Sequence, residues 1–566
     1  MKKLINNPHN VVREMLEGLA LGNSDIMLAD DAQVIIQQGL ADPAQRKVAV
    51  ISGGGSGHEP AHAGYVGLGM LTAAVAGDVF TSPDVDSIFA TIMATAGPAG
   101  AVLIVKNYTG DRLNFGLAAE LAIQEGIPTE IIVVADDVAL RSTVRPERSR
   151  GVAGTVFVHK IVGAAAAQGW ALADVVALGR AVSAATQSMS VGLSACTIPA
   201  SGQPGFDLAD NEIEFGLGIH GERGVRRAEL MPADDIVDVL LDAALNGLDA
   251  SGARDVAVMV NGLGGTPVME LHITARRLLQ KLGDSGLPAS RVYVGNFMTA
   301  LEMQGMSITL LRLEPEWMPL LDSPTVARAW PVTGQATGVL QTCTLPRRAR
   351  PQFDDLQPGP QQAVIAKALT TVADTLTAAE DYLTELDSKG GDGDLGLSMS
   401  RGAAALRALP AHVSGSAEAA LTSAAHALQG AIAGSSGPFY ATALMRAARV
   451  LSGVSSPTAQ QWQQAFAAGA EAITELGGAR VGDRTMVDAL QPAAQAWRKV
   501  LEQGIGPVQA FEAAVSAADR HARETAGLQA ALGRASYLGE RAIGVPDGGA
   551  MAVSIWMAAI LKSLQA

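Results

Sequence analysis

Three carboxylates crowd into a glycine-rich segment in the second half of the chain. Asp387, Asp392 and Asp394 lie within the stretch Leu386–Gly396, which also holds four glycines. Carboxylates this close repel one another unless water or a cation neutralises them, and Mg²⁺ prefers such hard oxygen ligands. The ordinary alternative is a solvated Asp-Gly turn, and the spacing does not match an EF-hand, which needs a later bidentate Glu. We therefore predict a magnesium site here.

Three more glycine-rich segments follow: Gly434–Gly437, Gly477–Met486 and Gly544–Gly549. Backbone N–H groups at a helix start, with hydroxyl side chains beside them, bind anions. The second segment adds Arg480 and Arg484 as cations for phosphate. Each segment alone is equally well a turn between helices with a serine cap. Together with the acidic segment they predict a site for a nucleotide and Mg²⁺.

The most informative segment of the first half is Ser52–Pro60, which carries four glycines in five residues and ends in His58-Glu59-Pro60. Glycine lets backbone N–H groups approach a ligand closely, because no Cβ stands in the way. A P-loop needs Lys followed by Ser or Thr, which this segment lacks. The segment is therefore predicted to be a glycine loop that holds something other than nucleotide phosphates.

Two further polar segments accompany it. Lys106–Asp111 follows a β-rich run, so it is expected at the carboxyl end of a strand, where open α/β sheets bind ligands. His220 lies among glycines in Gly216–Gly224. A lone histidine is more often structural than catalytic, but residues in glycine-rich loops seldom serve to pack a core. We keep His58 and His220 as candidate chemical groups and treat the other seven histidines as structural.

The elements that must position these residues change character along the chain. In residues 1–344, short β-rich runs alternate with Ala- and Leu-rich segments such as Phe115–Glu125, which predicts βαβ units and mostly parallel sheet. A soft internal boundary is expected near Ser190–Pro204, where small residues, Gly and Pro collect. The runs predicted as strands are Val48–Ile51, Val102–Val105, Ile131–Val134, Val256–Val260 and Ser307–Leu311.

A proline-rich segment separates this region from a helical one. Residues 345–361 carry four prolines and predict a semi-extended linker. Beyond them β-branched runs nearly vanish, and apolar residues recur at helical spacing, as in Ile365, Leu369, Val372 and Leu376. Residues 362–566 are therefore predicted to form an all-helical domain of about eight helices.

Composition excludes several classes of protein. A hydrophobic content of 48% with 17% charged residues is typical of a well-buried globular chain, and the net charge of −15 argues against non-specific nucleic-acid binding. No uncharged apolar run reaches the ~18 residues of a membrane span, and the N-terminus lacks a signal-peptide pattern. The only cysteines, Cys196 and Cys343, form neither a metal pattern nor a disulfide framework. We expect a cytoplasmic protein.

The chain resembles the single-chain, ATP-dependent dihydroxyacetone kinases. The resemblance lies in five motifs that occur in the order of the family's two domains: Ser52–Pro60, Val105–Phe115, Gly218–Glu222, Gly391–Asp394 and Gly482–Met486. The first two are the most specific, and together the motifs span nearly the whole chain. The resemblance implies transfer of phosphate from ATP to dihydroxyacetone (glycerone). It also implies a ketone-binding α/β domain of two subdomains and a nucleotide-binding barrel of eight antiparallel helices.

The resemblance also implies roles for residues of the first domain. His220 attacks the substrate carbonyl and forms a hemiaminal through a ring nitrogen, which requires a neutral imidazole. Asp111 is the general base for the hydroxyl that receives phosphate, and His58 orients the bound ketone. Substrate oxygens are held by Lys106 and by the amides of Gly53 and Gly54. Glycerol has no carbonyl, so it cannot be captured.

In the second domain, Asp387, Asp392 and Asp394 are implied to hold two Mg²⁺ ions that bridge the ATP phosphates. A ketone and ATP would be the ligands, without nucleic acid or membrane, and a homodimer is favoured. The two sites must meet, either through movement about the linker or by one subunit serving its partner. The residues implied to line the nucleotide are Leu395, Ser398, Ser435, Ser436, Gly478, Thr485, Met486, Arg534 and Asp547.

Four positions depart from the commonest family pattern. Arg223 replaces a frequent proline, Leu395 a threonine, Ala433 a glycine and Gly548 a proline. Arg223 and Leu395 leave substrate choice open, so erythrulose or glyceraldehyde is an alternative acceptor. Of three rival functions, a non-catalytic ketone-binding regulator would need a broken acidic segment, and a kinase fed by a phosphocarrier protein usually has its two domains on separate chains. A flavin-nucleotide cyclase stays open as an alternative.

Overall fold

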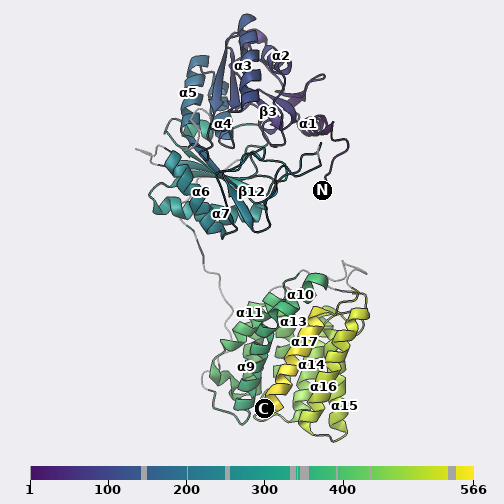
Figure 1. Ribbon diagram of the computed structural model, residues 1–566. Coiled ribbons are helices and arrows are strands. Elements are labelled where there is room, and N and C mark those ends of the chain that lie inside the picture. The colour runs from purple at the N-terminus through teal and green to yellow at the C-terminus, as the bar shows by residue number, and fades with distance from the viewer. Residues whose placement is uncertain are drawn as a thin grey trace. The chain divides into compact units, whose positions relative to one another are not determined.

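The computed structural model describes residues 2–141, 149–200, 202–248, 255–331, 340, 342–343, 353, 356–390, 393–432, 436–532 and 543–565. The chain divides into two compact units, Met1–Cys343 and Thr344–Ala566, both visible in Figure 1. Of the predicted linker 345–361, only residue 353 and residues 356–361 are described.

The first unit begins with a six-stranded mixed sheet in the order β1-β2-β4-β3-β5-β6. Four strands, β3 to β6, run parallel, while β1 and β2 are antiparallel additions at one edge. The strands are β1 (Ile26–Leu28), β2 (Val34–Gln37), β3 (Ala49–Ser56), β4 (Ala73–Val79), β5 (Ala101–Lys106) and β6 (Thr129–Val134).

Helices cover both faces of this sheet, which explains why its strands are continuous apolar runs. In β5, Leu103 and Val105 pack with α2 and α3 on one face, while Val102 and Ile104 pack with α1, α4 and α5 on the other. The helices are α1 (Val11–Leu21), α2 (Val85–Thr95), α3 (Thr109–Gln124), α4 (Thr155–Gln168) and α5 (Leu172–Ala184).

The second sheet of this unit has the order β11-β10-β12-β7-β8-β9, and only β10 and β11 are parallel. The prediction of mostly parallel sheet is therefore wrong for this half. Too few residues separate β11 from β12 for a helical crossover, so β12 returns antiparallel. The elements are β7 (Thr186–Gly192), β8 (Glu212–Phe215), β9 (Arg226–Glu229), α6 (Ala233–Gly247), β10 (Val256–Gly262), α7 (Val268–Asp284), β11 (Ala289–Gly295), β12 (Gly305–Arg312) and α8 (Met318–Leu321).

The two sheets share one hydrophobic core. Helix α4 is buried along nearly its whole length, from Thr155 to Ala166. Its side chains pack with β5 of the first sheet and with Met259 and Leu311 of the second. The chain changes sheets between Val134 and Thr186, because β7 is already an interior strand of the second sheet. That point lies before the region near Ser190–Pro204 where the boundary was expected.

All five predicted strands exist, as β3, β5, β6, β10 and β12. The glycine segment differs from its prediction, because Gly53, Gly54 and Gly55 lie within β3 rather than in a loop. They pair with Val75, Ala76 and Gly77 of β4. The strand ends at Ser56, so His58 follows it directly.

The second unit is all-helical among its described residues, and its helices form a closed ring. From α11 onward each helix packs against the next, while α17 and α11 both pack against α9. Helix α10 continues α9 at one end. None of the helices in the described parts of the chain combines the length and apolar character that a membrane crossing requires. The helices are α9 (Gln362–Ala378), α10 (Glu380–Gly390), α11 (Leu395–Arg407), α12 (Ala417–Ala431), α13 (Ser436–Val450), α14 (Ala459–Gly477), α15 (Val487–Glu502), α16 (Pro507–Glu524) and α17 (Gly548–Gln565).

The shared core gives a prediction for Gly163 on α4. A Cβ at Gly163 would overlap the carbonyl oxygen of Met70, whereas a Cβ at Gly116 on α3 would meet nothing within 4 Å. We expect Gly163→Ala to lower the free energy of unfolding by about 1–3 kcal/mol. The matched change Gly116→Ala should be neutral or stabilise by up to about 1 kcal/mol. Urea unfolding of both variants measures this, and an equal effect at the two positions would contradict the packing.

Candidate active site

The predicted residues of the first unit gather where two strands of the first sheet separate. Strand β3 pairs with β5 only as far as Ser52 and Ile104, although it continues alongside β4 to Ser56. The next strands in the chain lie on opposite sides of β3, which makes this the topological switch point where open α/β sheets bind ligands. Gly53 and Gly54 lie beyond the separation, and Lys106 is the last residue of β5.

Two histidines from different sheets meet at this point. The ring Nε2 atoms of His58 and His220 lie 3.0 Å apart, although the two residues are 162 positions apart in the sequence. His58 follows β3, while His220 lies in the loop between β8 and β9. His58 Nδ1 lies 2.7 Å from the carbonyl oxygen of Thr299. His220 Nδ1 lies 2.8 Å from Oε1 of Glu222.

The partners of the two rings fix where their protons lie. His58 Nδ1 faces a carbonyl oxygen and His220 Nδ1 faces a carboxylate, so both must donate. Burial, followed by the charges of Lys106 and His220, holds the pKa of His58 well below its ordinary value, so this ring is neutral and its Nε2 accepts. With a proton on both Nδ1 atoms, a hydrogen bond between the two Nε2 atoms needs one further proton, and only the ring that does not hold it has a free lone pair on Nε2.

The charge of Glu222 is firmly set. Burial raises the pKa of this carboxyl, but the hydrogen bond from the His220 ring and the charge of that ring outweigh burial and hold the pKa at about 2. The carboxylate also accepts the backbone N–H of His220 at 2.9 Å. Glu222 is thus an anion throughout the physiological pH range, bound to both the ring and the backbone of His220.

Aromatic rings wall the histidine pair. Phe80 stacks on His58 with ring centroids 5.1 Å apart and meets His220 edge-on at 5.2 Å. Tyr108 meets His220 edge-on at 4.7 Å. The ring of His58 is fully buried by these contacts, while the His220 side chain remains 20% exposed.

Lys106 and Asp111 approach the same site from β5 and the first turn of α3. A Cβ on Gly54 would lie 3.2 Å from Lys106 Nζ and 3.5 Å from Asp111 Oδ2, so only glycine leaves this space open. Asp111 Oδ1 accepts a hydrogen bond from Ser82 Oγ at 2.5 Å. Lys106 Nζ is buried and has no hydrogen-bond partner among the described residues. The ammonium lies 5.7 Å from the centroid of the Tyr108 ring and is attracted by the charges of Asp111 and Glu222, but its N–H groups make no hydrogen bond, which ligand oxygens would supply.

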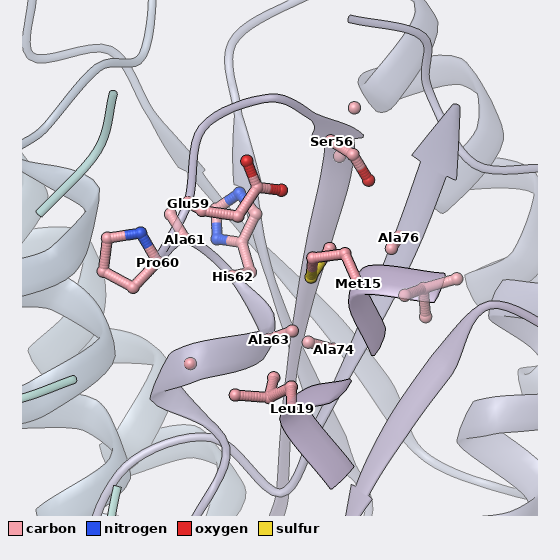
Figure 2. A pocket seen from close by; sticks show the side chains of 14 residues that line it. Met15, Leu19, Ser56, Glu59, Pro60, Ala61, His62, Ala63, Ala74 and Ala76 are labelled. Carbon is pink, nitrogen blue, oxygen red and sulfur yellow. The ribbon is translucent and has the colours of Figure 1, made fainter. Parts of the chain in front are cut away.

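One cavity of this unit is a neighbour of the site rather than the site itself. It has a volume of about 470 Å³ and is lined by Gly54, Glu59 and His62 together with apolar residues that include Met15 and Leu19 of α1. Figure 2 shows Glu59 and His62 on one side of the cavity and Met15 and Leu19 on the other. His220, Lys106 and Asp111 do not line it.

A second histidine pair, His62 and His159, lies beneath this cavity in the core. His62 Nδ1 lies 2.9 Å from His159 Nε2, and both rings are buried. Burial, then the charge of Lys106, lowers the pKa of His159 to about 3. Burial, followed by the charge of Lys106, also holds the pKa of His62 well below its ordinary value, so both rings are neutral, and their structural role stays a prediction.

The candidate residues of the second unit lie at helix ends. Asp387 is in the last turn of α10, and its Oδ2 accepts the N–H of Leu395 at 3.2 Å. A Cβ on Gly548 would lie 2.7 Å from Leu395 Cδ2 and 3.9 Å from Asp387 Cβ. On Gly549 it would lie 3.2 Å from Asp547 Oδ1 and 3.7 Å from Met486 Cβ. The structure therefore brings Asp387, Leu395, Met486 and Asp547 together.

The other predicted residues of this unit lie at nearby structural positions or outside the described ranges. Asp394 is the N-cap of α11, where Ser398 N–H donates to its carbonyl at 3.0 Å. Thr485 Oγ1 accepts from Val487 N–H at 3.2 Å. Gly478 is the left-handed C-cap of α14, and Ser436 begins α13. Asp392, Ser435 and Arg534 lie outside the described residues.

Electrostatics in this unit suit a cation. Burial raises the pKa of Asp547 to about 6, and the negative charges of Asp488 and Asp387 add to the rise while Arg484 opposes it. Carboxylate oxygens are the ligands that Mg²⁺ prefers, although the Arg484 guanidinium already offsets part of the charge of this group. Within the described ranges no three side chains form a complete metal site, and Asp392 falls in the gap at 391–392.

Sequence reasoning missed four residues that shape these sites. Asp488 accepts the N–H groups of Gly482 and Thr485 at 2.6 and 2.8 Å, and so folds the loop before α15. Glu222 lay inside a recognised motif but carried no assigned role. Phe80 gave no signal beyond being apolar. Thr299 contributes a backbone carbonyl, which no residue type reveals.

Comparisons with known proteins agree with this two-unit arrangement. The Dak1 domain family matches residues 17–329, and the DAK2 domain family matches residues 389–562. The chain is 41% identical to the putative 3,4-dihydroxy-2-butanone kinase of Solanum lycopersicum, over 98% of this chain and 97% of that protein. It is 40% identical to the triokinase/FMN cyclase of Homo sapiens, over 100% and 99% respectively.

A solved structure is also similar along the whole length. It is the crystal structure of the dihydroxyacetone kinase from C. freundii in complex with AMP-PNP and Mg²⁺. The TM-score is 0.64 and the sequence identity 33%, and the match covers 99% of each chain.

The unpartnered ammonium of Lys106 gives a prediction about stability. We expect Lys106→Met to raise the free energy of unfolding by about 1–3 kcal/mol, because it removes a buried charge that has no hydrogen bond. Lys160 is the matched control: it is also buried, but its Nζ donates to the carbonyl of Leu320 at 2.8 Å. Lys160→Met should therefore destabilise by about 1–3 kcal/mol. Urea unfolding without ligand tests this, and a loss of stability in Lys106→Met would show that Lys106 serves the fold rather than a ligand.

Proposed function

The chain belongs to the dihydroxyacetone kinase family, in which Dak1 and Dak2 domains are joined in one chain, and on that premise we propose that it transfers phosphate from ATP to dihydroxyacetone. The observation that carries this proposal is the setting of His220. Its Nδ1 is held by Glu222, so its Nε2 is the atom left to react, and that atom faces His58, whose ring also feels the charge of Lys106.

Capture of the ketone begins with separation of the two rings. The carbonyl carbon takes the place now occupied by the contact between His58 and His220. When the further proton lies on His58, the lone pair of His220 Nε2 attacks that carbon, and the π electrons of the carbonyl move to the oxygen. The oxygen takes the proton from His58 Nε2, which leaves His58 beside the new hydroxyl as its hydrogen-bond partner. The product is a hemiaminal whose hydroxyl is neutral and whose His220 ring carries the positive charge.

The remaining groups act on the terminal hydroxyls. Lys106 would donate to a substrate oxygen, which gives its ammonium the partner it lacks. Gly53 and Gly54 lie past the point where β3 leaves β5 but still pair with β4, so only backbone groups on the β5 side are open to a ligand. Asp111 would accept the proton of the attacking hydroxyl, as a general base near the start of α3. Glycerol presents the same hydroxyls but no carbonyl for His220.

The nucleotide and metal belong to the second unit in this proposal. Asp387 and Asp394, with Asp392 between them in the chain, would hold Mg²⁺, and the charge on Asp547 and Asp488 supports a cation there. When bound, two Mg²⁺ ions would neutralise the phosphate charge of ATP and fix the direction of transfer. Met486, Thr485 and Leu395 supply the surrounding surface, together with the predicted residues Ser398, Ser435, Ser436, Gly478 and Arg534.

The acceptor has a specific alternative. A four-carbon ketose such as erythrulose fits the same chemistry, since capture needs only a carbonyl and a neighbouring hydroxyl. The tomato relative is named for a four-carbon ketone, which supports this reading. Glyceraldehyde, the three-carbon aldose isomer of dihydroxyacetone, is a further alternative acceptor. A regulator without catalysis would need to have lost its acidic segment, and Asp387 and Asp394 are both present.

A phosphocarrier-fed kinase and a flavin-nucleotide cyclase would each make a different demand on the nucleotide site. Supply of phosphate by a phosphocarrier requires a permanently bound nucleotide, which fits separate domains better than this fusion. Cyclisation of a flavin nucleotide would use the second unit, and the human relative carries that activity in its name. The homodimer and the cytoplasmic location remain predictions from the sequence.

An assay of the full-length protein tests the proposal. With ATP and Mg²⁺ we expect phosphorylation of dihydroxyacetone, and a value of kcat/KM for glycerol lower by a factor on the order of 100 or more. Erythrulose and glyceraldehyde are tested as further acceptors. A flavin nucleotide is tested in a separate reaction in which it is the only substrate. A higher kcat/KM for erythrulose would establish the four-carbon alternative. Absence of turnover on every short ketose and aldose would reject the kinase.

Removal of one carboxylate tests the metal site separately. We expect Asp394→Ala to weaken Mg²⁺-dependent binding of AMP-PNP by about 10–100-fold, because a ligand to the ion is lost. Isothermal titration calorimetry with Mg²⁺ and with EDTA measures this. Asp374→Ala is the control, since Asp374 is an exposed carboxylate on α9 that pairs with Arg407 at 2.9 Å. Unchanged binding in the Asp394 variant would remove this residue from the metal site.

A further inference from the structure

Glu222 holds His220 at two points with one carboxylate. Its Oε1 lies 2.8 Å from the ring Nδ1, and its Oε2 accepts the backbone N–H of the same histidine at 2.9 Å. The ring and the backbone of His220 are thus tied to a group only two residues further along the chain. The roles carried over from the family resemblance do not include this residue.

The contact selects which nitrogen of His220 can react. A carboxylate only accepts hydrogen bonds, so the nitrogen that faces it must carry a proton. A neutral His220 therefore has its proton on Nδ1 and its lone pair on Nε2. The carboxylate also offsets the positive charge that appears on the ring once Nε2 has bonded to carbon.

Gly218 provides the space in which this carboxylate sits. A Cβ at Gly218 would overlap Glu222 Oε2 and would lie 2.7 Å from Arg150 Nη1. Arg150 cannot easily yield, because its Nε donates to Asp137 at 2.7 Å and its Nη2 donates to the carbonyl of Gly216 at 2.6 Å. A side chain at position 218 would therefore displace Glu222 rather than Arg150.

We propose that Glu222 is the positioning residue for ketone capture, and that Gly218 must lack a side chain so that Glu222 can reach His220. The proposal rests on the capture step described under the proposed function. In that step Glu222 contacts neither the ketone nor the nucleotide. Its task is to keep the proton on Nδ1, so that the lone pair of Nε2 faces the carbonyl carbon.

The step balances without a further reactant. One bond forms between His220 Nε2 and the carbonyl carbon, and the carbonyl π bond breaks. The oxygen receives the proton from His58 Nε2. The proton on Nδ1 stays in its hydrogen bond to Glu222, and the positive charge of the substituted ring faces that carboxylate.

The variant Glu222→Gln tests this by reversing the tautomer. The amide oxygen can replace one acceptor, but the amide NH₂ then donates to Nδ1 and places the ring proton on Nε2. We expect kcat/KM for dihydroxyacetone to fall by about 100-fold or more. The low turnover of glycerol and the affinity for AMP-PNP should stay unchanged. The main readout is the ratio of kcat/KM for dihydroxyacetone to kcat/KM for glycerol, since a merely structural defect would lower both values together.

The matched control is Glu214→Gln. Glu214 is also a buried carboxylate that holds this loop, accepting Gly224 N–H at 2.7 Å, but it does not contact His220. It should keep the wild-type ratio. Gly218→Ala should lower the ratio as Glu222→Gln does, although position 222 is intact. Native mass spectrometry with dihydroxyacetone should show the adduct in wild type and Glu214→Gln only.

The outcomes separate this inference from the proposed function. If the wild type shows neither an adduct nor a preference for the ketone, capture itself is wrong and the role of Glu222 falls with it. If the wild type captures the ketone and Glu222→Gln keeps the wild-type ratio, the positioning role alone is wrong. An equal loss in Glu214→Gln would reduce the effect to loop folding and would overturn the proposal. A wild-type ratio in Gly218→Ala would overturn the claim that position 218 must lack a side chain.

Discussion

The 3.0 Å contact between the Nε2 atoms of His58 and His220 depends on almost everything else in the first unit. The two rings come from different sheets, so the contact exists only if those sheets are locked together. Helix α4 does this by lying buried between them. The backbone of Thr299 adds a clamp, because its carbonyl accepts from His58 and its N–H donates to the carbonyl of His58. A loss of packing around α4 would therefore disturb the contact between His58 and His220.

The same contact explains the use of glycine and charge around it. Gly54 leaves room beside Lys106 and Asp111, and Gly218 leaves room for Glu222. The ammonium of Lys106 is buried at a cost to stability, and its charge adds to the effect of burial, which lowers the pKa of His58 and keeps that ring neutral at rest. A cost of this kind is expected where a site is prepared for a ligand rather than for the fold. The acidic helix ends of the second unit follow the same principle in part, since Asp488 and Asp387 raise the pKa of Asp547 while Arg484 lowers it.

Much of this was predictable from the sequence, for identifiable reasons. The β3 and β5 runs are continuous and β-branched, so they were found, and the motifs around His58, Lys106 and His220 indicated the family. Antiparallel pairing of β12 was missed because it depends on the length of a connection rather than on residue type. The glycine segment was expected as a loop, but β4 pairs with it. The roles of Thr299, Glu222 and Asp488 arise from backbone atoms or from contacts that residue identity alone does not reveal.

The central claim is that His220 bonds covalently to a ketone carbon, and carbon NMR observes that atom directly. The full-length protein would be mixed with dihydroxyacetone labelled with ¹³C at the carbonyl carbon, with His220→Gln as the comparison. The account predicts that the bound signal of the wild type moves from the carbonyl region to that of a tetrahedral carbon bonded to nitrogen and oxygen, and that the variant shows no such signal. A bound signal that remains in the carbonyl region of the wild type would contradict it.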